Sequence, residues 1–140
     1  MEHLLTFTTS HPFLVGGIVV VAMMLINSLF AEKLRGYSSV TPTQTTQMIN
    51  HENAIILDVR EMKEYSSGHI VNSVHIPLSN LKTRISELDK YKNQKIIVSC
   101  RSGNRSSQAC ASLKKEGFEE VFNLSGGIMA WENASLPLVK

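Results

Sequence analysis

The stretch KIIVSCRSGNRSSQACASLKKEG (95–117) decides the fold, because it predicts a strand, a loop and a helix in direct succession. Its first six residues, KIIVSC (95–100), are rich in β-branched side chains, as expected for a buried strand. The loop RSGNRS (101–106) follows. The next segment, SQACASLKKEG (107–117), has an apolar stripe and a closing glycine that are typical of a helix. Cys100 therefore lies where a strand ends and a loop begins.

Three further short apolar runs predict strands. They are AIILDV (54–59), VHIP (74–77) and VFNL (121–124), and each is bounded by turn-forming residues.

Helical patterns lie between these strands. One covers residues 43–50, directly after Pro42, which suits the first turn of a helix. Another is predicted to be capped by Ser79 and to have an apolar face within 81–88. Strands that alternate with helices of these lengths predict a parallel sheet covered by helices, so the fold class is α/β.

Composition limits the class of protein. The chain has 140 residues, enough for one modest domain, and its net charge of +2 does not favour a nucleic-acid surface. Its two cysteines exclude a disulfide framework. The five histidines are scattered singly and no spacing matches a zinc site, so the sequence predicts neither a metal nor a cofactor.

The first part of the chain is apolar. Residues 12–31, PFLVGGIVVVAMMLINSLFA, carry no charge, and twenty helical residues span about 30 Å, the thickness of a bilayer core. A buried core helix is disfavoured because the segment is apolar on every face. A cleaved signal peptide is disfavoured because residues 1–11 lack Lys and Arg and Leu29 does not suit a cleavage site after Ala31.

These patterns predict four parts. They are a short N-terminal tail (1–11), a transmembrane helix (12–31), a linker (32–37) and a domain (38–140). Lys33 and Arg35 follow the apolar segment, so the positive-inside rule predicts an N-terminus outside and a cytoplasmic C-terminal domain. We therefore expect a single-pass membrane protein, anchored through 12–31 in a bacterial inner membrane.

Cys100 is the candidate nucleophile. In parallel sheets, ligands bind beyond the carboxyl ends of strands, and Gly103 allows the following loop to turn its N–H groups inward. The next helix adds its positive dipole end, and Arg101 and Arg105 add full charges. All of these favour the thiolate, which is the reactive form. The alternative of a buried structural cysteine suits Cys110, which lies mid-helix among apolar neighbours.

One alternative chemistry is that of a cysteine phosphatase, which hydrolyses phosphate esters, or of a related arsenate reductase. Cysteine phosphatases place an arginine after Cys and five further residues, whereas here Arg105 comes after only four. The loop is one residue short for that pattern. A smaller cradle suits a single transferred atom, such as a sulfane sulfur, better than a tetrahedral phosphate.

Four sequence blocks together resemble the single-domain rhodaneses along residues 38–138. They are LDVREMKEYSSGHI (57–70), NSVHIPLSNL (72–81), CRSGNRS (100–106) and VFNLSGGIMAWENASLPL (121–138). The resemblance implies a rhodanese-like five-stranded parallel sheet with flanking helices and an active loop from Cys100 to Arg105. It also implies a sulfurtransferase. Cys100 would take a sulfane sulfur from thiosulfate, a persulfide or a polysulfide and pass it to a thiol or to cyanide.

The resemblance also implies roles for the residues around Cys100. The substrate-binding loop would be Arg101, Ser102, Gly103, Asn104 and Arg105. Asp58, Arg60 and Ser106 would support it, and for Asp58 and Arg60 we favour a structural ion pair. The partners would be small sulfur donors and thiol acceptors, with acceptor proteins as a further class and a membrane-protein partner not identified. A membrane-anchored binding module with little catalysis stays open as an alternative.

Overall fold

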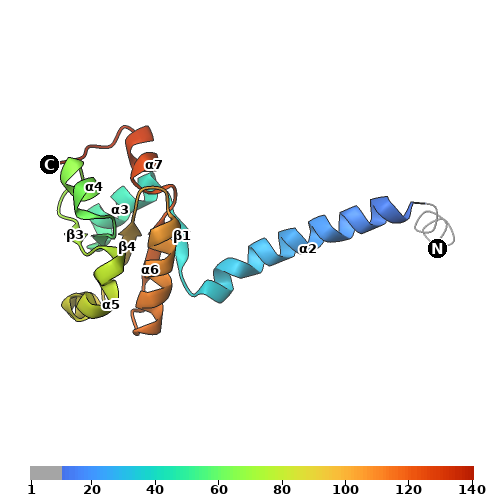
Figure 1. Ribbon diagram of the computed structural model, residues 1–140, viewed down its shortest axis with the longest axis horizontal. Coiled ribbons are helices and arrows are strands. Elements are labelled where there is room, and N and C mark those ends of the chain that lie inside the picture. The colour runs from blue at the N-terminus through green and yellow to red at the C-terminus, as the bar shows by residue number, and fades with distance from the viewer. Residues whose placement is uncertain (1–10) are drawn as a thin grey trace. The chain divides into compact units, whose positions relative to one another are not determined.

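The computed structural model describes residues 11–140. Contacts divide the chain into two compact units, Met1–Arg35 and Gly36–Lys140. All but the last residue of the predicted tail, 1–11, lies outside the described residues. Figure 1 shows both units and labels most of their helices and strands.

The first unit contains one long helix, α2, Pro12–Arg35 (24 residues). None of its described side chains is buried, and most of its large apolar side chains are about half to almost fully exposed. The segment Pro12–Ala31 is long and apolar enough to cross a membrane. A signal sequence meets the same criteria of length and composition, whereas a core helix would have its side chains covered.

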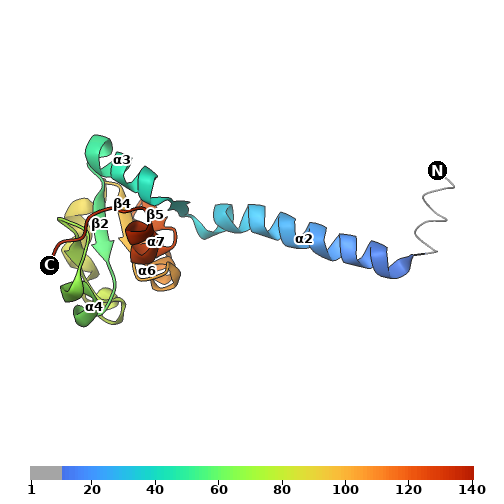
Figure 2. The same ribbon diagram turned by 90° about the horizontal axis from the view of Figure 1, so that it is seen from above.

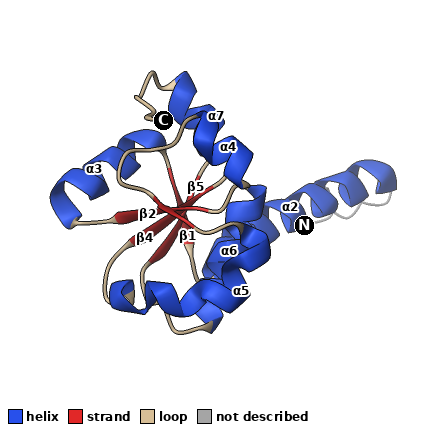
Figure 3. Cartoon of the chain, turned by 60° about the vertical axis from the view of Figure 1, so that its left-hand side comes forward, coloured by secondary structure: helices blue, strands red, loops and turns tan. Residues whose placement is uncertain are grey.

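The second unit is built on a sheet of five parallel strands, as the sequence predicted. The strands are β1 Ser38–Val40, β2 Ile55–Asp58, β3 Val74–His75, β4 Ile96–Ser99 and β5 Val121–Leu124. Their order across the sheet is β1-β5-β4-β2-β3, and every neighbouring pair is parallel. Figure 3 shows the strands surrounded by helices. The four strands read from apolar runs are confirmed. The fifth, β1, is only three residues long and most of it is exposed, so it leaves no such run.

Helices cover both faces of the sheet, and Figure 2 shows α3 and α6 on opposite sides of it. The helices are α3 Pro42–Glu52, α4 Met62–Ser67, α5 Leu81–Arg84, α6 Asn104–Lys115 and α7 Gly127–Asn133. Two 3₁₀ helices, η1 Leu78–Asn80 and η2 Ile85–Tyr91, flank α5. The helix predicted after Pro42 is confirmed, with Thr41 as its N-cap and Pro42 in its first turn.

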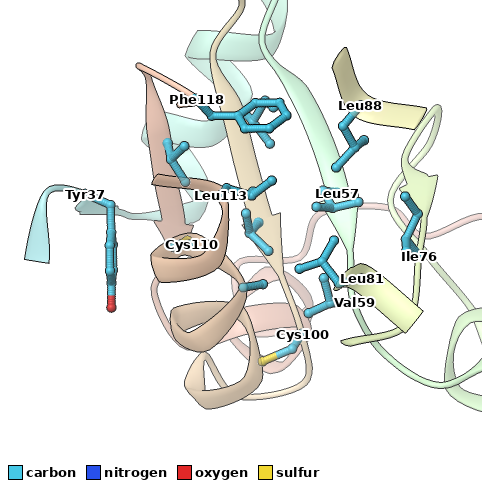
Figure 4. Close-up of a cluster of buried hydrophobic side chains, with 14 residues drawn as sticks. Tyr37, Leu57, Val59, Ile76, Leu81, Leu88, Cys100, Cys110, Leu113 and Phe118 are labelled. Carbon is cyan, nitrogen blue, oxygen red and sulfur yellow. The ribbon is translucent and has the colours of Figure 1, made fainter. Parts of the chain in front are cut away.

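Alternate residues of the central strand point into two separate cores. Ile96 and Val98 pack in a cluster with Cys110 and Leu113 of α6, which Figure 4 shows. Ile97 packs on the other face, in the cluster that contains side chains of α3 and α7. Because β4 is buried on both faces, its sequence is continuously apolar, as is typical of a parallel sheet.

Two expected helix starts are wrong. Ser79 does not cap a helix: it lies inside η1, and its hydroxyl donates to Asn80 Oδ1 at 3.2 Å. The chain already turns at Pro77, whose carbonyl accepts from the Asn80 N–H at 2.9 Å, so the helical segment starts earlier in 3₁₀ form. Likewise α6 starts at Asn104 and not at residue 107, because Gly103 with φ +106° completes the turn before it.

Candidate functional site

Cys100 follows the last residue of β4, the middle strand of the sheet, and precedes the turn into α6. Its residue surface is 1% exposed. In Figure 4 its sulfur lies beside the first turns of α6. The position is the carboxyl edge of a parallel sheet, where α/β folds place their ligand sites.

The sulfur of Cys100 is held inside its own loop. The Gly103 N–H donates to Sγ at 3.0 Å, and the Ser106 hydroxyl lies 3.3 Å from Sγ. Burial raises the pKa of the Cys100 thiol, but hydrogen bonds from the Ser106 hydroxyl and from the N–H groups of Ser106, Gly103 and Ser102 lower it by more. The pKa of Cys100 therefore lies below the ordinary value, as expected of a cysteine that reacts as a thiolate.

Ser106 has one hydroxyl proton and two acceptors for it. The hydroxyl lies 2.6 Å from Asn123 Oδ1, and Asn123 Nδ2 donates to the Gly103 carbonyl at 3.2 Å. When Cys100 is a thiol, Ser106 can donate to Asn123 and accept from the thiol. When Cys100 is a thiolate, the Ser106 hydroxyl can donate its proton to Sγ in place of Asn123 Oδ1. Asn123 thus connects β5 to the middle of the loop at Gly103 and to its end at Ser106, and it was not among the residues predicted from the sequence.

The start of α7 holds the backbone of the loop from the other side. The Ile128 N–H donates to the Cys100 carbonyl at 2.8 Å, and the Met129 N–H donates to the Arg101 carbonyl at 3.1 Å. Gly127, with φ +58°, makes this approach possible: a Cβ there would lie 2.3 Å from the Cys100 carbonyl oxygen. Only glycine fits at this position without a backbone shift.

Arg105 is paired with a carboxylate. Its two terminal nitrogens donate to the two carboxylate oxygens of Glu64, each at 2.8 Å. These bonds lower the pKa of Glu64 to about 2, against a smaller opposing effect of its burial. Glu64 also accepts from the Glu61 N–H at the start of α4. Arg105 therefore ties the loop to α4. It is not the unpaired cation expected from the sequence, and its partner Glu64 was not among the predicted residues.

Asp58 and Arg60 form the ion pair that the sequence predicted. The guanidinium of Arg60 donates to both oxygens of Asp58 at 2.8–3.0 Å and to the Gly68 carbonyl at 2.8 Å. Both residues are buried, with 1% and 5% of their surfaces exposed. A buried pair with this many hydrogen bonds fixes the connection from β2 to α4 beside the Cys100 loop.

The remaining predicted residues are distributed around the loop. Ser102 contributes its N–H, Asn104 begins α6 and is exposed, and Arg101 is exposed at the mouth of a pocket. Cys110 is fully buried, and burial raises the pKa of its thiol, as expected for a core residue. Within residues 11–140, no three His, Cys, Asp or Glu side chains gather as a metal site.

Comparisons with known proteins agree with this geometry. The family model described as a rhodanese-like domain matches residues 41–134. A sulfurtransferase from Allochromatium vinosum is 37% identical over 93 residues, which cover 66% of this chain and 85% of that protein. The uncharacterized protein YibN of Escherichia coli K12 is 29% identical over 141 residues, covering 100% of this chain and 99% of that one.

The fold also has solved counterparts. The crystal structure of a rhodanese-related protein from Thermoplasma volcanium superimposes with a TM-score of 0.67 at 33% identity. The match covers 74% of this chain and 98% of that one.

Proposed function

The chain belongs to the rhodanese family, and on that premise we propose that it transfers sulfane sulfur through a persulfide on Cys100. The observation that carries the proposal is the cradle around Sγ. A thiolate at the end of the central strand, held by the Gly103 N–H at 3.0 Å and with a lowered pKa, is suited to attack sulfur.

The first step loads the sulfur. The Cys100 thiolate attacks the outer sulfur of thiosulfate, a new S–S bond forms at Cys100, and the S–S bond of thiosulfate breaks. The electron pair of that bond leaves with sulfite. The product is a Cys100 persulfide anion, and the inward N–H groups that stabilise the thiolate stabilise it in the same way.

The second step returns the enzyme to its starting state. An acceptor thiolate attacks the outer sulfur of the persulfide, and the Cys100–sulfur bond breaks with its electron pair on Cys100. The acceptor leaves as a persulfide, or as thiocyanate when cyanide is the acceptor. The charge on Cys100 is the same before and after the cycle, so no separate general base is required.

The loop residues are proposed to bind the substrate. Arg101 supplies an exposed positive charge next to Cys100, and the N–H groups of Ser102 and Gly103 converge on sulfur. Arg105 is proposed to add charge near the donor. Both terminal nitrogens of Arg105 donate to Glu64. Arg105 therefore either attracts the anionic donor while it stays paired with Glu64, or releases Glu64 and binds the donor in its place. Asn104 and Ser106 complete the loop wall.

We expect the purified chain to produce thiocyanate from thiosulfate and cyanide and to leave aryl phosphate unhydrolysed. The reason is the size of the loop, which has four residues between Cys100 and Arg105. The measurement is turnover of both substrates by the same preparation. Phosphate release without thiocyanate would favour a phosphatase, and inactivity with both substrates would favour a binding module.

We further propose that α2 anchors the protein in a membrane, with the N-terminus outside and the C-terminal unit in the cytoplasm. The support is a 20-residue apolar segment with no buried residues, followed by Lys33 and Arg35. A spanning helix satisfies its own backbone hydrogen bonds, which lipid requires.

This anchor predicts how the chain behaves on extraction. The full chain should stay in the membrane pellet after an alkaline wash, whereas a chain that begins at Tyr37 should be soluble and keep its turnover. Tyr37 is the first buried residue of the second unit, so the cut leaves its core intact. Release by the wash would contradict a spanning helix, and protection of a C-terminal tag from cytoplasmic labelling would reverse the orientation.

A further inference from the structure

A pocket of about 200 Å³ lies beside the Cys100 loop. It is lined by residues of the β2–α4 connection, of α4, of α7 and of the C-terminal segment, together with Arg101. Its wall on the α7 side includes Ile128 and Met129, whose N–H groups bind the carbonyls of Cys100 and Arg101. Two residues that line the pocket are thus hydrogen-bonded to the backbone of the Cys100 loop, although Cys100 itself does not line the pocket.

The lining of the pocket includes a buried cation, Arg60, with one nitrogen that is not hydrogen-bonded. Arg60 uses Nε and Nη2 for Asp58 and Gly68, and among the described residues its Nη1 has no hydrogen-bond partner. Within residues 11–140, the one fully enclosed side-chain polar atom without a partner is Thr45 Oγ1. Arg60 Nη1 is therefore not fully enclosed, although Arg60 as a whole is only 5% exposed, and Arg60 lines this pocket. A guanidinium nitrogen that still has N–H groups to donate can bind one oxygen of a carboxylate or a similar anion.

The rim carries one charge of each sign. Arg101 and Glu132 both line the pocket and are exposed, and neither is in an ion pair within the part of the chain that the structure describes. The other two charged groups of the lining, Arg60 and Glu64, are already balanced by Asp58 and Arg105. The unbalanced charges are thus one cation and one anion, with the apolar Met129 and Leu138 also in the lining.

We propose that this pocket binds the acceptor of the sulfur, and that the acceptor is a small amino-acid thiol of the cysteine type. Its carboxylate would lie between Arg60 Nη1 and Arg101, and its ammonium group would face Glu132. An inorganic donor such as thiosulfate has no ammonium group and no aliphatic stem, so it uses neither Glu132 nor the apolar wall. This inference rests on the proposed function, because it concerns the second step of that reaction.

The test uses the full chain in mild detergent, loaded with sulfur from thiosulfate and freed of the donor. Four thiols then remove the sulfur: L-cysteine, 3-mercaptopropionate without the ammonium group, cysteamine without the carboxylate, and 2-mercaptoethanol without either. The readout is the concentration of each thiol that gives the half-maximal rate, divided by the value for 2-mercaptoethanol with the same protein. Comparing this ratio between proteins cancels the intrinsic reactivity of each thiol.

We expect two substitutions at the rim to change selectivity in different directions. Arg101→Gln should raise the relative half-maximal concentrations of L-cysteine and 3-mercaptopropionate by roughly tenfold, since a charged hydrogen bond contributes at least that factor. It should leave the relative half-maximal concentration of cysteamine, which has no carboxylate, unchanged. Glu132→Gln should raise the relative half-maximal concentrations of L-cysteine and cysteamine, which carry the ammonium group. It should lower that of 3-mercaptopropionate, because a negative charge near its carboxylate is removed. The matched controls Lys115→Gln and Glu119→Gln make the same charge changes on exposed residues outside the pocket and should alter no ratio.

The outcomes separate this inference from the function on which it rests. If no sulfur loads on Cys100, the proposed function fails and this inference fails with it. If 2-mercaptoethanol removes the sulfur but the ratios are the same in wild type, Arg101→Gln and Glu132→Gln, the function holds and the acceptor pocket is refuted. Equal changes in the control variants would also refute it, because the selectivity would then follow net charge.

Discussion

Replacing Cys100 with serine will reduce sulfur transfer to background, and the variant will gain no mass when it is incubated with thiosulfate. The wild-type chain should gain the mass of one sulfur atom, located on Cys100 and removable by cyanide or a small thiol. A serine hydroxyl stays protonated at neutral pH, even with the Gly103 N–H and the Ser106 hydroxyl close to it. It therefore cannot attack and carry sulfane sulfur as a thiolate does.

Cys110 provides the matched control in the same chain. It is fully buried in the cluster under α6, and its sulfur donates only a weak hydrogen bond to the Phe122 carbonyl at 3.5 Å. Cys110→Ala should keep the mass shift and the turnover while losing about 1–2 kcal/mol of stability, as for a small truncation in a core. A sulfur adduct on Cys110, or turnover by Cys100→Ser, would contradict the proposed mechanism.

The two cysteines show how far sequence reasoning reaches in this fold. Cys100 ends an apolar strand and precedes a glycine-containing loop, so its sulfur was expected near inward N–H groups, and the structure places it there. Cys110 shares a helical stripe with Ala109 and Leu113, so its burial was expected too. Both predictions depend on residues close in sequence, for which periodicity and turn chemistry are informative.

Contacts between distant residues were not predictable in this way. Glu64 lies 41 residues from Arg105, and Asn123 lies 17 residues from Ser106. Both contacts arise because elements far apart in the chain meet at the carboxyl edge of the sheet. One signal for Asn123 was present: it is a polar residue inside the apolar run VFNL, in a strand that pairs with β4. For Glu64 no signal was present, because a glutamate in a short polar helix has the same sequence pattern whether it is solvated or, as here, partly buried against an arginine.

Replacing Gly127 with alanine will have the largest effect on stability among the substitutions considered, and it will also reduce turnover. The new Cβ would lie 2.3 Å from the Cys100 carbonyl oxygen and 2.6 Å from the Arg101 carbonyl carbon, both backbone atoms that cannot rotate away. Overpacking and a left-handed φ for alanine together cost about 2–5 kcal/mol. Denaturant unfolding measures the stability, and thiocyanate formation by the fraction that remains folded measures the activity.

Gly117→Ala separates the two contributions to this cost. Gly117 also has a positive φ, of +87°, but a Cβ there would meet nothing within 4 Å. It should lose about 1–2 kcal/mol from backbone conformation alone and keep its turnover. Gly127→Ala should lose more stability than this and should also lose turnover. Relief of the clash must move the carbonyl groups of Cys100 and Arg101, which accept hydrogen bonds from α7. The loop N–H groups that face Sγ would then move as well. Equal losses for the two variants would mean that the contact between α7 and the loop does not position Cys100.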